Sequence, residues 1–141
     1  MNIDSIERGL VIDHIAAGRG MEIVQLLELD KMTCPVAVIR NARSGKTGKK
    51  DIIKIEDEVD LNLDVLGFID PNITVNVIVG SEIVEKKRIA QPKQVVNVVK
   101  CINPRCITST ERELKQIFRR SEHGGPYRCA YCEQEYQKQN E

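Results

Sequence analysis

The chain has 141 residues, and its 21 Lys plus Arg balance its 21 Asp plus Glu, so its formal net charge is zero. This length suits one ordinary domain or two small ones. The balanced charge argues against a protein whose main task is to grip nucleic acid, because phosphate contacts draw on a cationic excess. The sequence shows neither an apolar run long enough to span a bilayer nor the pattern of a signal peptide, so we expect a cytoplasmic protein with reduced thiols and no membrane partner.

The first two thirds of the sequence predict alternating strands and helices. In chain order the expected elements are a strand at 10–15, a helix at 21–29, strands at 34–39 and 51–55, a helix at 59–68, and strands at 74–79 and 82–89. The strands are rich in β-branched residues, whereas Ile23, Leu26 and Leu27 recur at helical spacing. The polar residues 41–50 are expected to form a loop. The order β-α-β-β-α-β is that of a ferredoxin-like sandwich, an α+β fold whose antiparallel sheet carries both helices on one face and leaves the other open.

Four of the five cysteines lie in the last third of the chain. They are Cys101, Cys106, Cys129 and Cys132. Two close pairs separated by a longer segment are typical of the two knuckles of a four-thiolate zinc site, and four thiolates leave no open position, so we expect one structural zinc ion per chain. An iron–sulfur cluster and buried free thiols are the alternatives. Cys34, alone in an apolar strand, is expected to be a small core residue.

A change of character around Pro92 predicts a domain boundary. We expect a first domain at 1–95 and a small all-β zinc-ribbon domain at 96–141. A zinc-ribbon module that binds nucleic acid or acts in transcription would share the cysteine spacing, and it is the alternative function for this part of the chain.

Charged residues interrupt the apolar strands of the first domain. They are Asp13, His14, Lys54 and Lys86. They form either a solvated sheet face or a site for an anionic, hydroxyl-bearing ligand, because lysines neutralise phosphates and a carboxylate accepts from hydroxyl groups. The segment 44–47 resembles the last residues of a P-loop motif. It is not a P-loop, because Arg40 stands where the motif requires its first glycine. A small nucleotide-processing enzyme using Asp13 and His14 is a further alternative, although no set of nucleophile, base and orienting residue is evident.

Several segments, taken together, resemble the regulatory chain of aspartate carbamoyltransferase. They are GLVIDHI at 9–15, KDIIKIE at 50–56, TVN at 74–76, and the closing cysteine pattern from Cys101 to Glu133. The resemblance covers nearly the whole chain in order. It implies a non-catalytic subunit of pyrimidine biosynthesis with an N-terminal effector and dimerisation domain and a C-terminal zinc domain that holds the catalytic chain. It also implies nucleoside triphosphate effectors, with CTP as inhibitor, ATP as activator and UTP in some members.

The resemblance further implies which residues touch the nucleotide. The matching positions are Ile3, Ser5, Ile6, Asp13, His14, Ile52, Lys54, Asn76, Ile78, Ile83 and Lys86, with Ser44, Gly45 and Lys50 in a loop that approaches the phosphates. His14 and Lys86 are expected near the phosphates, and Lys54 at the ribose or a base carbonyl. Asn103, Arg105 and Glu133 match positions that contact the catalytic chain.

The chain departs from a familiar family member at two of these places. Ser81 stands where that member has a tyrosine beside the base, and Arg105 replaces an asparagine in the first zinc knuckle. The first change bears on the preference between purine and pyrimidine, and the second on the contacts with the catalytic chain.

Overall fold

The computed structural model describes residues 6–45 and 48–137 and divides the chain into two compact units, Met1–Gln91 and Pro92–Glu141. The elements of unit 1 are β1 (Arg8–Ala16), α1 (Gly20–Leu26), the 3-10 turn η1 (Leu29–Lys31), β2 (Val36–Ser44), β3 (Gly48–Ile55), α2 (Leu63–Ile69), β4 (Thr74–Val79) and β5 (Glu82–Arg88). Those of unit 2 are β6 (Gln94–Val96), the 3-10 turn η2 (Ile107–Ser109), β7 (Ile117–Ser121) and β8 (Gly124–Cys129). Unit 2 begins before the expected residue 96, because β6 pairs with β7.

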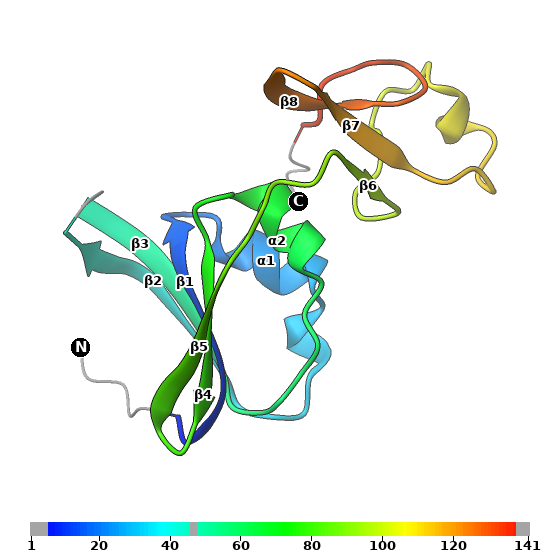
Figure 1. Cartoon of the computed structure of the whole chain (residues 1–141). Helices are drawn as coiled ribbons and strands as arrows, with labels where there is room; N and C mark the ends of the chain where they lie inside the picture. Colours follow the sequence, from blue (N-terminus) through cyan, green and yellow to red (C-terminus); the bar gives the residue numbers. More distant parts are fainter. Residues whose placement is uncertain (1–5, 46–47, 138–141) are drawn as a thin grey trace. The chain divides into compact units, whose positions relative to one another are not determined.

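Unit 1 is a five-stranded sheet in the order β2-β3-β1-β4-β5, and every neighbouring pair of strands is antiparallel. Both helices lie on the same side of this sheet (Figure 1). The order β2-β3-β1-β4 is that of the ferredoxin-like sandwich, and β5 extends it at one edge. The α+β fold with an antiparallel sheet, expected from the sequence, is therefore confirmed.

The core of unit 1 fills the space between the sheet and the helices. Side chains alternate between the two faces of a strand, so every second residue of each central strand points to the helices. The fully buried members include Ile12, Ile15, Ile23, Ile53, Ile55, Leu66, Ile73 and Val75. Helix α2 begins where the side chain of Asn62 accepts hydrogen bonds from the backbone N–H groups of Asp64, at 3.0 Å, and Val65, at 3.4 Å.

Four local predictions were wrong. The expected loop at 41–50 is mostly strand, because β2 and β3 form a hairpin in which Arg43 pairs with Lys49 and Ser44 with Gly48. Helix α2 begins at Leu63 rather than residue 59, and α1 ends at Leu26. Cys34 precedes β2 and is half-buried, so it is not a strand residue of the core.

Two β-bulges flank β3, one in β1 and one in β2. In β1, Ile12 pairs with Ile53 and Ile15 with Asp51, so one more residue of β1 than of β3 lies between these pairs. In β2 the same happens between Ile39 and Ala42. His14 and Asn41 lie in these two bulges, and both have a φ of 59°. This is the left-handed backbone conformation that residues other than glycine rarely adopt. The bulges bend two strands at the same end of the sheet.

Unit 2 is a three-stranded antiparallel sheet in the order β6-β7-β8. Cys101 and Cys106 lie between β6 and β7, whereas Cys129 ends β8 and Cys132 follows it. Phe118 and Tyr127 are its largest buried side chains. The ring of Phe118 meets that of Tyr136 edge to face, with centroids 5.7 Å apart. Among the described residues of the whole chain, the helices are too short and too polar to cross a membrane.

Candidate ligand-binding face and metal centre

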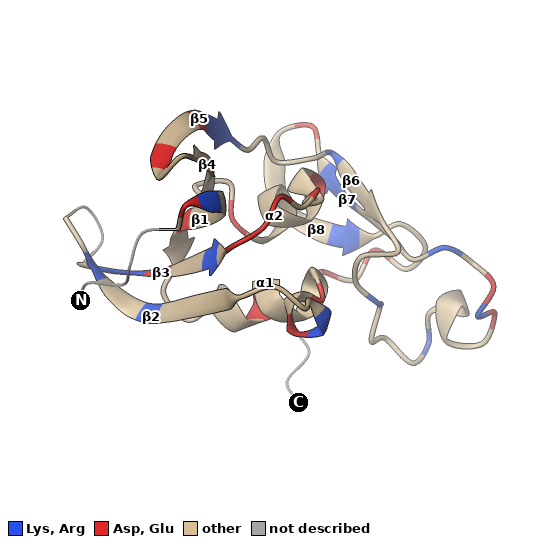
Figure 2. Ribbon diagram, turned by 90° about the horizontal axis from the view of Figure 1, so that it is seen from below, with Lys and Arg blue, Asp and Glu red and all other residues tan. Residues whose placement is uncertain are grey.

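One row of side chains, all polar except that of Val11, crosses four strands on the open face of the sheet. Val11 of β1 lies opposite Lys54 of β3 on one side and opposite Asn76 of β4 on the other. Asn76 in turn lies opposite Lys86 of β5. Residues directly opposite one another in an antiparallel pair point to the same face. Lys54, Asn76 and Lys86 therefore share the face that the helices leave open, and Figure 2 shows basic residues in blue on β3 and β5.

A second row runs beside the first. Asp13 lies opposite Thr74, and Thr74 opposite Arg88. Asp13 Oδ1 accepts a hydrogen bond from the backbone N–H of His14 at 2.6 Å and forms an ion pair with Lys50 Nζ at 2.9 Å. The ring Nδ1 of His14 lies 2.9 Å from the Thr74 hydroxyl. The β1 bulge thus turns His14 toward Thr74, while Asp13 holds Lys50.

A pocket of about 830 Å³ lies at the end of the sheet where the two bulges occur. Its walls are His14, Ile15, Ala16, Ala17, Ser44, Lys49, Lys50, Asp70, Pro71, Asn72, Ile73, Thr74, Arg88 and Ile89. Two lysines, an arginine and an imidazole are among them, beside the single carboxylate of Asp70. That carboxylate already accepts from the backbone N–H groups of Ala16, at 3.1 Å, and Asn72, at 2.9 Å. The pocket therefore offers more donors than acceptors, which suits an anion.

The residues predicted for the nucleotide fall into three groups. His14, Ser44 and Lys50 line the pocket itself. Lys54, Asn76 and Lys86 lie in the adjoining row, and the side chains of Asp13, Ile52, Ile78 and Ile83 belong to the same four strands, with Ile78 opposite Ile83. Ile6 is buried just before β1, and Gly45 follows β2. Ile3 and Ser5 lie outside the described residues.

The pocket residues that the sequence analysis missed include the two cations Lys49 and Arg88 and the hydroxyl-bearing Thr74. Arg88 could have been found, because strand alternation places it on the same face as Lys86. Lys49 could not, since it was assigned to a loop. Thr74 belongs to the segment TVN at 74–76, which supports the family resemblance. Its contact with His14 depends on the bulge in β1.

The four cysteines of unit 2 meet in one cluster. Their sulfur atoms all lie within 4.8 Å of one another, and two of the separations are 3.6 Å, between Cys101 and Cys132, and 3.7 Å, between Cys106 and Cys129. A tetrahedral ion bound by four thiolates at about 2.3 Å would hold its sulfurs about 3.8 Å apart. The four thiols therefore fit a tetrahedral metal ion with sulfur shifts of at most about 1 Å.

Burial and hydrogen bonding shift the pKa values of three of these thiols in different directions. Burial raises the pKa of Cys101 to about 12 and raises that of Cys129 as well. Burial acts in the same direction on Cys132, but hydrogen bonds from the Asn103 side chain, the Gln134 backbone and neighbouring thiols outweigh it and lower its pKa to about 7. A cation would favour the thiolates, so binding would release protons. The hydroxyl of Thr108 donates to Cys106 Sγ at 3.1 Å, which is the outer contact that orients a ligand.

The positions expected to face the catalytic chain surround this cluster. The side chain of Asn103 accepts from the backbone N–H of Arg105 at 3.0 Å, and the Arg105 side chain is exposed. Glu133 is exposed, with a φ of 65° directly after Cys132. Ile102 and Ile107, in the first knuckle, are 43% and 51% exposed. The knuckle thus presents apolar and charged groups together on its surface.

The chain thus joins an α+β domain with basic residues on an open sheet face to a small domain in which four cysteines meet. Residues 1–90 match the family model described as aspartate carbamoyltransferase regulatory chain, allosteric domain, and residues 93–141 match the metal binding domain of the same chain. The chain therefore belongs to the family of aspartate carbamoyltransferase regulatory chains, as the resemblance indicated. It is a regulatory chain and not the catalytic one.

Curated relatives agree over nearly the whole length. The chain is 49% identical to the aspartate carbamoyltransferase regulatory chain of Clostridium botulinum (strain Hall) over 137 residues, which cover 96% of this chain and 94% of the relative. It is 48% identical to that of Clostridium acetobutylicum, with the same coverage, and 45% identical to that of Bifidobacterium longum, covering 96% and 98%. The similarity favours the regulatory interpretation over the nucleic-acid-binding module and the small enzyme.

Proposed function

We propose that the open face of unit 1 binds nucleoside triphosphates and that the chain transmits this binding to a catalytic partner, with CTP as inhibitor, ATP as activator and UTP as a further ligand. The observation that carries the proposal is the row formed by Lys54, Asn76 and Lys86 next to a pocket walled by His14, Lys50 and Arg88. Cations at this density match a triphosphate.

The two parts of this face suit different parts of a nucleotide. The pocket supplies point charges for phosphate oxygens from Lys49, Lys50 and Arg88. Asp13 accepts a hydrogen bond from a ribose hydroxyl or keeps Lys50 in place, since its carboxylate already pairs with that ammonium group. Ile52 and Ile78 offer apolar surface for the base. Ser81 lies in the turn between β4 and β5, where its backbone N–H donates a hydrogen bond to the carbonyl oxygen of Glu7 at 2.9 Å.

Calorimetric titration of the full, metal-loaded chain with CTP and ATP tests this proposal. Lys86→Ala should weaken binding about tenfold or more, because a hydrogen bond to a charged group contributes about 1.5–3 kcal/mol. Lys87→Ala is the matched control. Lys87 lies opposite the buried Val75, hence on the other side of β5, and should leave the binding constant within about twofold. Absence of binding by the unmodified chain, or equal losses in both variants, would contradict the proposal.

We further propose that the metal is zinc, one ion per chain, with a structural role. Four thiolates at tetrahedral spacing without an open coordination position are typical of structural zinc. The protein would supply all four ligands from two knuckles, and the ion would contribute folding free energy and no chemistry. Metal analysis of the purified chain should give about one zinc and no iron.

The partner proposed for unit 2 is the catalytic chain of aspartate carbamoyltransferase, contacted through the first knuckle with Asn103 and Arg105 and through Glu133. We also propose that unit 1 forms a homodimer and that the complex works in the cytoplasm, where reduced thiols persist. Effector binding and partner state must be coupled reciprocally. Arg105→Ala should weaken recovery of the co-expressed catalytic chain while leaving nucleotide binding unchanged.

A further inference from the structure

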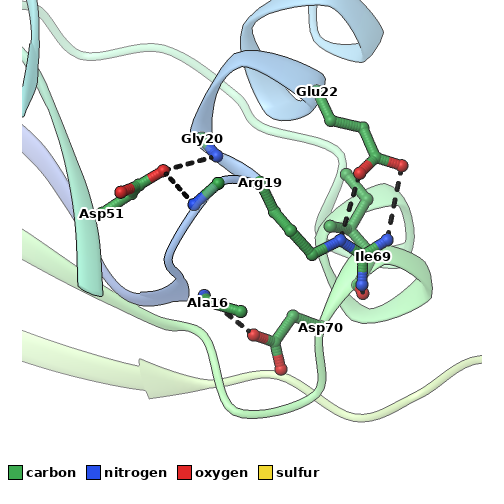
Figure 3. Close-up of polar contacts among 8 residues, drawn as sticks. Ala16, Arg19, Gly20, Glu22, Asp51, Ile69 and Asp70 are labelled. Atoms are coloured by element: carbon green, nitrogen blue, oxygen red, sulfur yellow. Dashed lines mark hydrogen bonds and ion pairs between the residues drawn. The ribbon is translucent and has the colours of Figure 1, made fainter. Parts of the chain in front are cut away.

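A buried carboxylate lies behind the proposed nucleotide pocket. Asp51 of β3 is 0% exposed and points to the helices, in line with Ile53 and Ile55. Its Oδ2 accepts from the backbone N–H of Gly20 at 2.9 Å and of Gly18 at 3.1 Å, and its Oδ1 accepts from that of Asn41 at 3.0 Å. Figure 3 shows the carboxylate aimed at the turn between β1 and α1. One side chain thus holds two segments that are far apart in the sequence.

The position of Asp51 coincides with both bulges. It pairs with Ile15, directly after the β1 bulge that contains His14. The amide of Asn41, the left-handed residue of the β2 bulge, is one of its three donors. The next residues on either side, Lys50 and Ile52, point to the opposite face of the sheet, because side chains alternate along a strand. Asp51 therefore holds from behind the strand that presents Lys50 to the pocket.

The turn bound by Asp51 is also tied to α2. The backbone N–H of Ala16 donates to Asp70 Oδ2 at 3.1 Å. The guanidinium of Arg19 donates to the carbonyl of Ile69 and pairs with the buried Glu22, with a nitrogen–oxygen distance of 3.1 Å. These contacts appear together in Figure 3. Ala16 and Asp70 also line the pocket, so this one turn connects the pocket wall with both helices.

We propose that Asp51 is a positioning residue for the anion-binding pocket and that it couples ligand occupancy to the turn at 16–20. The proposal rests on the function proposed above and deepens it, since it names the route by which binding leaves the site. Asp51 itself touches no ligand. It keeps the two bulges in register so that His14 and Lys50 face the same pocket. When a ligand displaces these two residues, Asp51 transmits the movement to Gly20, where α1 begins.

Amide exchange in the full, metal-loaded chain is the direct readout, measured by nitrogen-15 NMR with inorganic tripolyphosphate and with CTP as probes. In the unmodified chain, saturation with either probe should slow exchange of the Gly18, Gly20 and Asn41 amides at least about fivefold, because coupling between two sites is reciprocal. These three amides donate to Asp51, and none of the three residues lines the pocket. A residue with a purely structural role would leave their exchange independent of the ligand.

Asp51→Asn removes the acceptor pattern with little change in shape. An asparagine offers one oxygen, so either Asn41 or the two glycines must face an amide N–H2 group. Affinity for tripolyphosphate should fall about tenfold, since hydrogen bonds to charged groups are the strong ones. The effect of the ligand on exchange should also disappear. Glu58→Gln makes the same change in charge at an exposed residue paired with Arg8, and should change neither.

Gly20→Ala is a second variant that keeps the carboxylate. A Cβ at Gly20 would lie 2.9 Å from Asp51 Oδ2 and 3.1 Å from its Cβ, so the side chain must move. It should reproduce the loss of coupling with a smaller loss of affinity, and it serves if Asp51→Asn does not fold.

The outcomes separate the two proposals. If the unmodified chain binds the probes but the three amides exchange at unchanged rates, the role of Asp51 is overturned and the nucleotide site stands. Wild-type affinity in both variants would overturn it equally. If the unmodified chain binds neither probe, the nucleotide site fails and Asp51 has nothing to position.

Discussion

Removal of the metal is predicted to unfold unit 2 and to leave unit 1 folded. The buried apolar side chains of unit 2 are few: Val95, Val99, Phe118 and Tyr127, apart from the cysteines. A structural zinc site contributes about 10–16 kcal/mol, which equals or exceeds the roughly 5–15 kcal/mol by which whole domains are stable. Loss of the ion therefore exceeds any stability that this small core can supply. Unit 1 contains its own sheet, helices and core, and none of its described residues belongs to the cysteine cluster.

The distribution of tyrosines makes this prediction easy to measure. The chain has three tyrosines and no tryptophan, and Tyr127, Tyr131 and Tyr136 all lie in unit 2. Near-ultraviolet circular dichroism from tyrosine therefore reports on unit 2 alone, while the far-ultraviolet signal of α1 and α2 reports on unit 1. A strong chelator should abolish the first signal and retain the second. Cys129→Ser should behave like the chelated chain, and Cys34→Ser should behave like the unmodified one.

The refuting result is specific. If a coloured chelator shows that one equivalent of metal has left each chain and the tyrosine signal is unchanged, the metal does not hold unit 2 together. The fold of unit 2 would then rest on its apolar contacts, against the reasoning from its size.

Three further predictions concern the metal equilibrium and the backbone. Lowering the pH should weaken metal binding by more than about tenfold per pH unit in a competition titration. The metal binds thiolates, and burial raises the pKa of Cys101 to about 12, so protons compete with the metal. An affinity independent of pH would exclude the release of protons on binding. Asn62→Ala should lower the free energy of unfolding of unit 1 by about 0.5–2 kcal/mol in urea, because two backbone N–H groups lose their acceptor, and Asn62→Asp should not. Gly9→Ala should lower it by more, about 3 kcal/mol or greater, since a Cβ there would lie 2.0 Å from the carbonyl oxygen of Ile55; a loss below that of Asn62→Ala would show that β1 shifts freely.

The faces of the central strands could be predicted from the sequence, whereas the bulges could not. Alternation alone places Lys54 and Lys86 away from the core. His14 departs from this alternation because β1 inserts a residue between Ile12 and Ile15. The two consecutive polar residues at 13 and 14 mark this place in the sequence, but they do not distinguish a bulge from a solvated strand face. The hairpin at 41–50 was missed for a related reason: its residues are polar on both faces, so pairing with a neighbour, rather than burial, makes them a strand.

Asp51 shows where a signal was present and was not used. In the segment 50–56 its position has the same parity as Ile53 and Ile55, so the pattern already places a carboxylate on the buried face. A buried carboxylate needs donors, and the two glycines that supply them lie more than thirty residues earlier in the chain, at 18 and 20. Pattern reasoning can thus predict that a partner exists, but only the folded chain identifies it. The metal cluster is the opposite case, because the spacing of the four cysteines was enough to predict that they meet.

Strand β5 has a consequence for how this protein behaves in solution. It is the last strand of its sheet, all seven of its residues are exposed, and Ile83 and Val84 leave 50% and 60% of their surface accessible. Such an edge invites addition of strands from other molecules, and consecutive cations prevent it by mutual repulsion. Lys86, Lys87 and Arg88 supply that repulsion at one end. Neutralising them would therefore promote aggregation. An anion held on the open face by Lys86 and Arg88 would cancel two of these three charges, so solubility would fall as such a ligand is added.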